Sequence, residues 1–126
     1  MKNDKKKVLI IEAHSDDSAI SIAGFLEKFL NNYEYHFALI ATSSMSLHHS
    51  GFLTREQRLA EYEKYINRFD GIWHKPDNLP LDEESKLDLY PKNKLVSITE
   101  TIILEVKPQI LICQGPSFHH DHTAVY

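Results

Sequence analysis

Residues 8–17 of this chain read Val-Leu-Ile-Ile-Glu-Ala-His-Ser-Asp-Asp, an apolar run that ends in a histidine and two aspartates. The apolar part does not alternate with polar side chains, which predicts a strand buried on both faces of a parallel sheet. In open sheets of this kind, ligands bind at the carboxyl ends of the strands. The sequence therefore places His14, Asp16 and Asp17 where a functional site is expected.

A second cluster of the same kind lies near the other end of the chain. Residues 110–113, Ile-Leu-Ile-Cys, form another apolar run, and residues 119–122 read His-His-Asp-His shortly after it. If both runs are parallel strands, their carboxyl ends gather at one edge of the sheet. The two clusters are distant in sequence, but both follow predicted strands. This pattern is typical of a single metal site whose ligands are brought together by folding.

The segments between the clusters predict alternating strands and helices. Apolar runs predict strands at 8–12, 37–41, 72–74 and 109–113. Helical spacing predicts helices at about 17–30, 55–69 and 94–106, with loops at 42–54 and 76–91. Thr54 and Gln57 form a capping-box pattern at the start of the second helix. The order β-α-β-α-β-α-β predicts an α/β fold with a Rossmann-like open parallel sheet, flanked by helices and joined by right-handed crossovers.

Length and composition narrow the possible functions. The 126 residues suit a single domain, and the net charge of −4 argues against a nucleic-acid partner. The apolar runs are shorter than the roughly 18 residues of a membrane span, and the first is too short for a secretory signal, so we expect a cytoplasmic protein. The one cysteine, Cys113, excludes an intramolecular disulfide and is expected to be a buried, inert thiol.

The residue types of the two clusters suit a zinc site. A catalytic zinc takes three ligands from His, Asp or Glu and keeps one position open for water. His14 and Asp17 are three residues apart across a strand-to-helix turn, so both can point at one ion, and His122 can supply the third ligand. Asp16 would project beside the ion, where a carboxylate can act as general base on the activated water.

Two further residues of the second cluster have expected roles. His119, three residues before His122, could face the same cleft and stabilise an oxyanion or protonate a leaving group. Asp121 could orient a histidine through its ring N–H, a common role for a carboxylate beside a metal ligand.

Residues 13–17 resemble the Ala-His-Pro-Asp-Asp-Glu motif of the PIG-L/LmbE-like deacetylases, and residues 119–125 resemble that family's His-Pro-Asp-His-x-Ala-Val motif. Arg58-x-x-Glu61 and the turn at 69–71 are similar to the family's Arg-x-x-Glu helix and the turn after it. The resemblance implies a zinc-dependent hydrolase that removes an acetyl or other acyl group from the nitrogen of an N-acetylglucosamine-type amino sugar or its conjugate. The expected partner is thus a small-molecule substrate.

The same resemblance implies a role for each matching residue. The zinc ligands would be His14, Asp17 and His122, a list that agrees with the reasoning from the residues alone. Asp16 would be the general base. His119 would polarise the amide carbonyl or stabilise the tetrahedral oxyanion, with Asp121 supporting it.

The chain also departs from the family pattern. Ser15 and His120 replace the two motif prolines, and His120 adds an imidazole that could bind metal or substrate. Ser18 replaces the acidic residue after the aspartate pair, which we expect to remove a carboxylate near the site. Family members usually continue well past the second motif, so residues 1–126 are expected to be the N-terminal catalytic portion of one domain. An incomplete sheet would leave an open edge and favour a homo-oligomer.

Other interpretations of these residues stay open. A metal-dependent phosphoesterase would need more carboxylates than the clusters supply, and a non-catalytic metal-binding or regulatory module would not need Asp16. Residues 119–122 could be an adventitious metal-binding tail, and His48 and His49 are expected to lie in a solvated loop. Arg58 and Glu61 could form a helix-surface ion pair, or Arg58 could anchor a loop near the site.

Overall fold

A computed structural model describes residues 5–49 and 51–126. Within these residues a four-stranded sheet has the order β5-β2-β1-β6, and every neighbouring pair is parallel. Its strands are β1 (Lys6–Glu12), β2 (Tyr33–Leu39), β5 (Ile72–Trp73) and β6 (Ile110–Cys113). Because all four strands point the same way, the predicted open parallel sheet of an α/β fold is confirmed.

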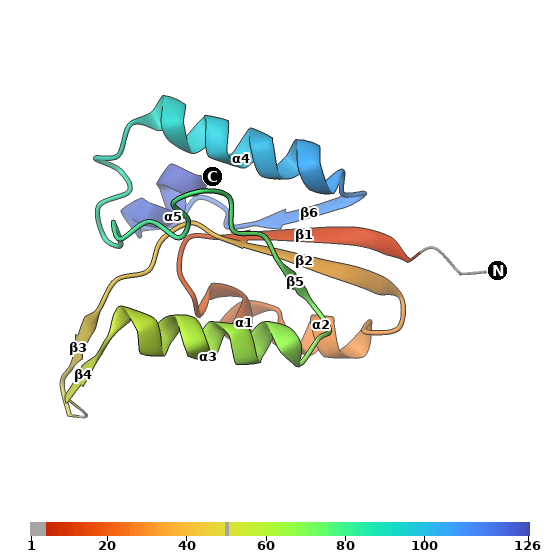
Figure 1. Cartoon of the computed structure of the whole chain (residues 1–126), viewed down its shortest axis with the longest axis horizontal. Helices are drawn as coiled ribbons and strands as arrows, with labels where there is room; N and C mark the ends of the chain where they lie inside the picture. The colour runs from red at the N-terminus through yellow and green to blue at the C-terminus, as the bar shows by residue number, and fades with distance from the viewer. Residues whose placement is uncertain (1–4, 50) are drawn as a thin grey trace.

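Helices cover both faces of the sheet, so that the sheet lies between two helical layers (Figure 1). They are α1 (Asp17–Ser21), α2 (Ala23–Lys28), α3 (Arg55–Asn67), α4 (Lys92–Val106) and α5 (His120–Val125). The first three lie on one face, and α4 and α5 lie on the other.

Alternation along the strands sends side chains to two separate cores. Leu9 and Ile11 of β1 pack in the core beneath α4, whereas Val8 and Ile10 pack in the core shared with α2 and α3. All four side chains are buried, and each stabilises the fold by roughly 1.5–3 kcal/mol. This two-sided burial explains why residues 8–11 are apolar without interruption.

The structure differs from the predicted elements in several places. The helix predicted for residues 17–30 is split at Ile22, whose φ of −132° is not helical, into α1 and α2. The loop predicted after the second strand contains a hairpin of β3 (Met45–Leu47) and β4 (Gly51–Leu53), which projects away from the sheet (Figure 1). Helix α5 was not predicted. The capping box of Thr54 and Gln57 is confirmed at the start of α3.

The prediction of a buried Cys113 is wrong, because the thiol is exposed. Strand β6 is at the edge of the sheet, and among the described residues it pairs with β1 alone. Leu111 on the same strand is 48% exposed. An apolar run at the edge of a sheet thus does not bury every side chain, and the sequence pattern does not reveal which strand is at the edge.

In the part of the chain that the structure describes, every helix is too short or too polar to cross a lipid bilayer.

Candidate metal centre

The loop between β1 and α1 holds the first cluster. The main chain leaves β1 at Glu12 and enters α1 at Asp17. The Asp17 side chain folds back over this loop, and its Oδ2 accepts a hydrogen bond of 2.9 Å from the backbone N–H of His14. Both side chains are thereby held at the carboxyl end of the strand, as the sequence predicts.

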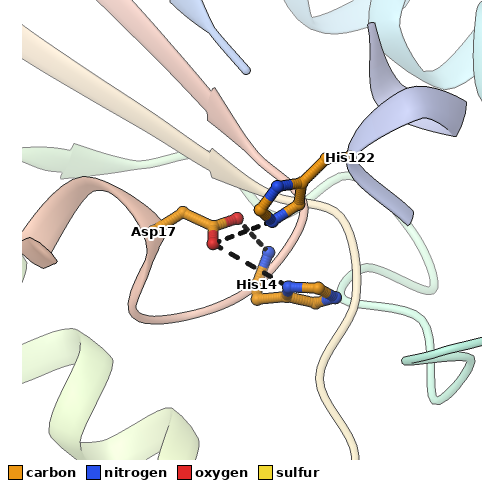
Figure 2. A group of neighbouring side chains, drawn as sticks. All are labelled: His14, Asp17 and His122. Carbon is orange, nitrogen blue, oxygen red and sulfur yellow. Dashed lines mark hydrogen bonds and ion pairs between the residues drawn. The ribbon is translucent and has the colours of Figure 1, made fainter. Parts of the chain in front are cut away.

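The two clusters converge. Strand β6 runs parallel to β1 with Cys113 opposite Ile11, so the segment that leads into α5 leaves the sheet beside the first cluster. His122 Nε2 lies 3.1 Å from Asp17 Oδ1, and His14 Nδ1 lies 3.8 Å from the same oxygen. Figure 2 shows the three side chains facing one another. One ligand atom from each residue lies within 4.8 Å of the others.

The polar atoms of these side chains that face away from the cluster have partners of their own. Nε2 of His14 bonds to Asp121 Oδ2 at 2.7 Å, and Gln114 Nε2 donates to Asp17 Oδ2 at 2.7 Å. The Ser117 hydroxyl oxygen lies 3.2 Å from His122 Nδ1 and can accept its proton.

This arrangement fits a metal ion. The three candidate ligand atoms lie close together and are Nδ1 of His14, Oδ1 of Asp17 and Nε2 of His122. Hydrogen-bond partners on the far side of each ligand fix its tautomer and its direction. Two imidazole nitrogens and one carboxylate oxygen match a catalytic zinc that has three protein ligands.

Asp121 is fully buried, and its carboxylate is held from several sides. Besides His14, it accepts hydrogen bonds from the backbone N–H groups of Ser85 and Leu87. Burial by itself raises the pKa of the Asp121 carboxyl, but the bonds from His14 and the two amides outweigh burial and lower it. Asp121 is therefore an anion in the protein interior. The sequence contains no pattern that links residues 85–87 to this site.

Electrostatics at the cluster favour a positive charge. Burial lowers the pKa of His14, but its interactions with Asp17 and Asp121 outweigh burial and raise that pKa to about 9. The pKa of Asp17 is lowered, because interactions with His14 and His122 outweigh the effect of burial. A site whose carboxylates stabilise a proton on His14 also stabilises a metal cation, and the two compete for the imidazole nitrogen.

His119 caps α5, and its ring lies beside those of His14 and His122. Its Nδ1 accepts a hydrogen bond of 3.2 Å from the backbone N–H of Asp121. Because Nδ1 is an acceptor, the neutral ring carries its proton on Nε2. The ring centroid lies 4.7 Å from that of His14. The family resemblance paired the Asp121 side chain with His119, whereas the structure pairs that carboxylate with His14 and leaves only the backbone N–H to His119.

Asp16 is not a member of the group formed by His14, Asp17 and His122. It is exposed, and it lines a cavity of about 300 Å³ together with Arg58 and Tyr62. A larger cavity, of about 560 Å³, adjoins Asp17 and His122 and extends along β6. Asp16 is thus solvent-accessible and adjacent in sequence to the candidate ligand Asp17, but it is not one of the candidate ligands.

Glu12 is a buried carboxylate that the sequence reasoning missed. It is fully buried, and it accepts hydrogen bonds from the Tyr62 hydroxyl at 2.6 Å and from Ser18 Oγ at 3.0 Å and Ser18 N at 2.9 Å. Burial raises the pKa of Glu12 to about 7, although the hydrogen bonds partly oppose this. Ser18 bonds to Glu12, so a carboxyl group lies beside the position where the resembled motif has an acidic residue. The available signal was an acidic residue at the end of an apolar strand.

Arg58 anchors a loop, as the alternative interpretation proposed. Its buried guanidinium donates to the carbonyl of Ser43 at 2.6 Å and to both carboxylate oxygens of Glu84. The ion-pair partner is thus Glu84, in the segment before α4, and not Glu61. His48 and His49 are exposed between β3 and β4 and belong to none of the candidate metal groups found among the described residues.

No family model and no curated protein matches this sequence. Several solved structures are similar to the chain, among them the following three. A deacetylase of the teicoplanin biosynthesis pathway has a TM-score of 0.68 at 14% identity and covers 94% of this chain and 59% of its own. The N,N'-diacetylchitobiose deacetylase from Pyrococcus horikoshii has a TM-score of 0.62 at 20% identity, covering 97% and 47%. The deacetylase of the antimicrobial A40926 pseudoaglycone has a TM-score of 0.65 at 16% identity, covering 97% and 56%.

These similarities extend over nearly all of this chain, which spans about half the length of the proteins that it resembles. At these levels of identity the similarity is one of fold. The chain has the fold of the LmbE/PIG-L-like deacetylases.

Proposed function

We propose that this chain is a zinc-dependent hydrolase that removes an acetyl or other acyl group from the nitrogen of an N-acetylglucosamine-type amino sugar or conjugate. The observation that carries the proposal is the convergence of His14, Asp17 and His122, with the buried Asp121 behind His14. A carboxylate behind a histidine is a typical support for a ligand of a catalytic metal. In this proposal residues 1–126 supply the catalytic part of the domain.

The substrate class is supported by the structural neighbours. One of them is named for N,N'-diacetylchitobiose, whose acetyl groups are carried on amino-sugar nitrogens. The other two are deacetylases connected with teicoplanin and with the A40926 pseudoaglycone. A deacetylation reaction is common to all three, and the amide bond is therefore the proposed target here.

The proposed roles are those that the family resemblance implies for the matching residues. A zinc ion bound by His14, Asp17 and His122 would supply a Lewis acid that lowers the pKa of water to about 7. Asp16, exposed beside the ligands, accepts the proton of the water that attacks the amide carbon and returns it to the departing amine. His119 donates its Nε2 proton as a hydrogen bond to the carbonyl oxygen, where negative charge develops. The products are a carboxylate and a free amine.

Metal content is the first test of this proposal. Elemental analysis of tag-free protein should find at least one tightly held zinc per chain, and Asp17→Ala should lose that ion. Asp16→Asn should keep the ion but lose amine release from N-acetylglucosamine conjugates by roughly 10²–10⁴-fold. Asp77→Asn is a matched control, because Asp77 is an exposed aspartate away from the cluster.

Either of two results would contradict the proposal. A protein that holds no zinc even when zinc is supplied would not have the proposed site. A protein that binds zinc but releases no amine from any such substrate would instead support the non-catalytic metal-binding module.

A further inference from the structure

Another group of potential metal ligands, formed by Asp88, His120 and Asp121, does not include His14. Nε2 of His120 is 3.9 Å from Asp88 Oδ1 and 3.7 Å from Asp121 Oδ1. The three side chains each offer one ligand atom, and these atoms lie within 4.8 Å of one another. His120 Nε2 donates a hydrogen bond of 2.8 Å to the carbonyl oxygen of Ser85, so an ion bound here would replace the proton on that nitrogen. An imidazole, two carboxylates and a carbonyl therefore converge at one place.

This group differs from the proposed catalytic cluster in its residues and in the oxygen that it uses. Asp88 and His120 have no part in the group of His14, Asp17 and His122. Asp121 is the link between the two groups, since its Oδ2 bonds to Nε2 of His14 while its Oδ1 is the oxygen nearer to His120.

The charge of the surrounding segment favours a cation. Residues 82–88 carry four carboxylates and one lysine. Arg58 neutralises Glu84, so the remaining acidic side chains outnumber the one basic side chain of this segment. Asp121 adds a carboxyl group that is fully buried.

We propose that Asp88, His120 and Asp121 form a second divalent-cation site, with the Ser85 carbonyl as an additional ligand. One nitrogen and three oxygens suit zinc and similar first-row ions, which accept imidazole and carboxylate together. The bound ion would fasten the segment before α4 to the start of α5. It would thus hold the same segment whose amide groups fix Asp121. His120 stands where the resembled motif has a proline, so that motif does not itself supply this proposed ligand.

The second site should be weaker than the first. Side chains of Asp88 and His120 are 47% and 49% exposed, and Asp121 Oδ1 already accepts a hydrogen bond from Leu87. An ion there must therefore fix two half-exposed side chains and share one oxygen. Zinc binding should show two classes of site, the stronger at the catalytic cluster and the weaker at this one.

The test is a Zn²⁺ titration of the chelator-treated protein. Binding is measured by calorimetry and by competition with a chromophoric chelator. Asp88→Asn and His120→Ala should each weaken the second class by about 10-fold or more and leave the first unchanged. Asp82→Asn is the matched control, because Asp82 is an exposed aspartate of the same segment outside the cluster. It should leave both classes unchanged. Retention of the first ion in the same sample shows that each variant is folded.

Three outcomes would overturn the second site. They are a single class of zinc in the unmodified protein, a second class that survives in both Asp88→Asn and His120→Ala, and a second class lost equally in Asp82→Asn. The inference does not depend on the proposed function. Asp17→Ala should remove the first class and keep the second, so loss of the proposed catalytic metal and loss of this site are distinguishable.

Discussion

Asp121 Oδ2 accepts a hydrogen bond of 2.7 Å from Nε2 of His14, a residue 107 positions earlier in the chain. This bond joins the two clusters, because it connects the loop after β1 to the start of α5. It also settles the tautomer of His14, since a ring that donates through Nε2 presents a lone pair on Nδ1 when neutral. Asp121 is therefore the residue through which the second cluster orients the first.

Replacing Asp121 with asparagine should weaken zinc binding at the first cluster by about 10–100-fold. The amide retains the size of the side chain but removes the negative charge behind His14. The measurement is the zinc affinity of each variant, obtained by competition with a chelator. Asp77→Asn is the control, because it removes the same amount of charge. An affinity within twofold of the unmodified protein would show that His14 does not need the Asp121 carboxylate.

The stability of the metal-free protein should depend on the titration of Glu12. Burial raises the pKa of this group from 4.5 to about 7, so the folded state binds its proton more tightly than the unfolded state does. The resulting stabilisation is fully present below pH 4.5 and is lost as the pH rises through 7. It amounts to roughly 3 kcal/mol. Glu12→Gln cannot titrate and should lack this pH dependence.

The check is urea unfolding of both proteins from pH 4 to pH 8. The difference in free energy of unfolding between them isolates the Glu12 contribution, because the other titrating groups are common to both. A difference that stays constant across this range would show that Glu12 is not perturbed.

The ion pair of Arg58 and Glu84 should contribute more to the free energy of unfolding than an exposed ion pair does. Both side chains are mostly buried, and Arg58 also holds the Ser43 carbonyl. Arg58→Ala leaves a buried carboxylate without its partner, which should cost about 3–5 kcal/mol of unfolding free energy. Arg68→Ala is the control, since Arg68 pairs with Glu27 at the surface and should cost less than about 1 kcal/mol. Equal losses in the two variants would argue against the anchoring role.

Strand β6 lies at an edge of the sheet, and this edge supports the prediction that the protein self-associates. Among the described residues this edge has no strand beside it, and it exposes Leu111 and Cys113. We expect light scattering to find a concentration-dependent oligomer under reducing conditions, and Leu111→Lys to shift it toward monomer, because a charge on an edge strand opposes pairing. Leu104→Lys, an exposed leucine on α4, is the control. A monomeric unmodified protein at all concentrations would contradict the prediction.

Much of the fold could be predicted from local patterns. The apolar run at 8–11 indicated the central strand, and the capping pattern at Thr54 indicated the start of α3. Both signals involve residues within a few positions of one another. The break at Ile22 and the hairpin after β2 could not be predicted, because packing against the sheet overrides weak helical and turn preferences there. The exposure of Cys113 likewise depends on which strand lies at the edge.

The sequence by itself determined the class of fold, the two strand exits that carry acids and histidines, and the chemical types of the candidate ligands. These follow from periodicity and residue identity, which act over short stretches of chain. Only the tertiary structure decided the partner of the Asp121 carboxylate, the burial of Glu12 against Tyr62, and the pairing of Arg58 with Glu84. Each joins segments between 26 and 107 positions apart. A buried charged group must find a partner, but only the path of the folded chain determines which partner is near.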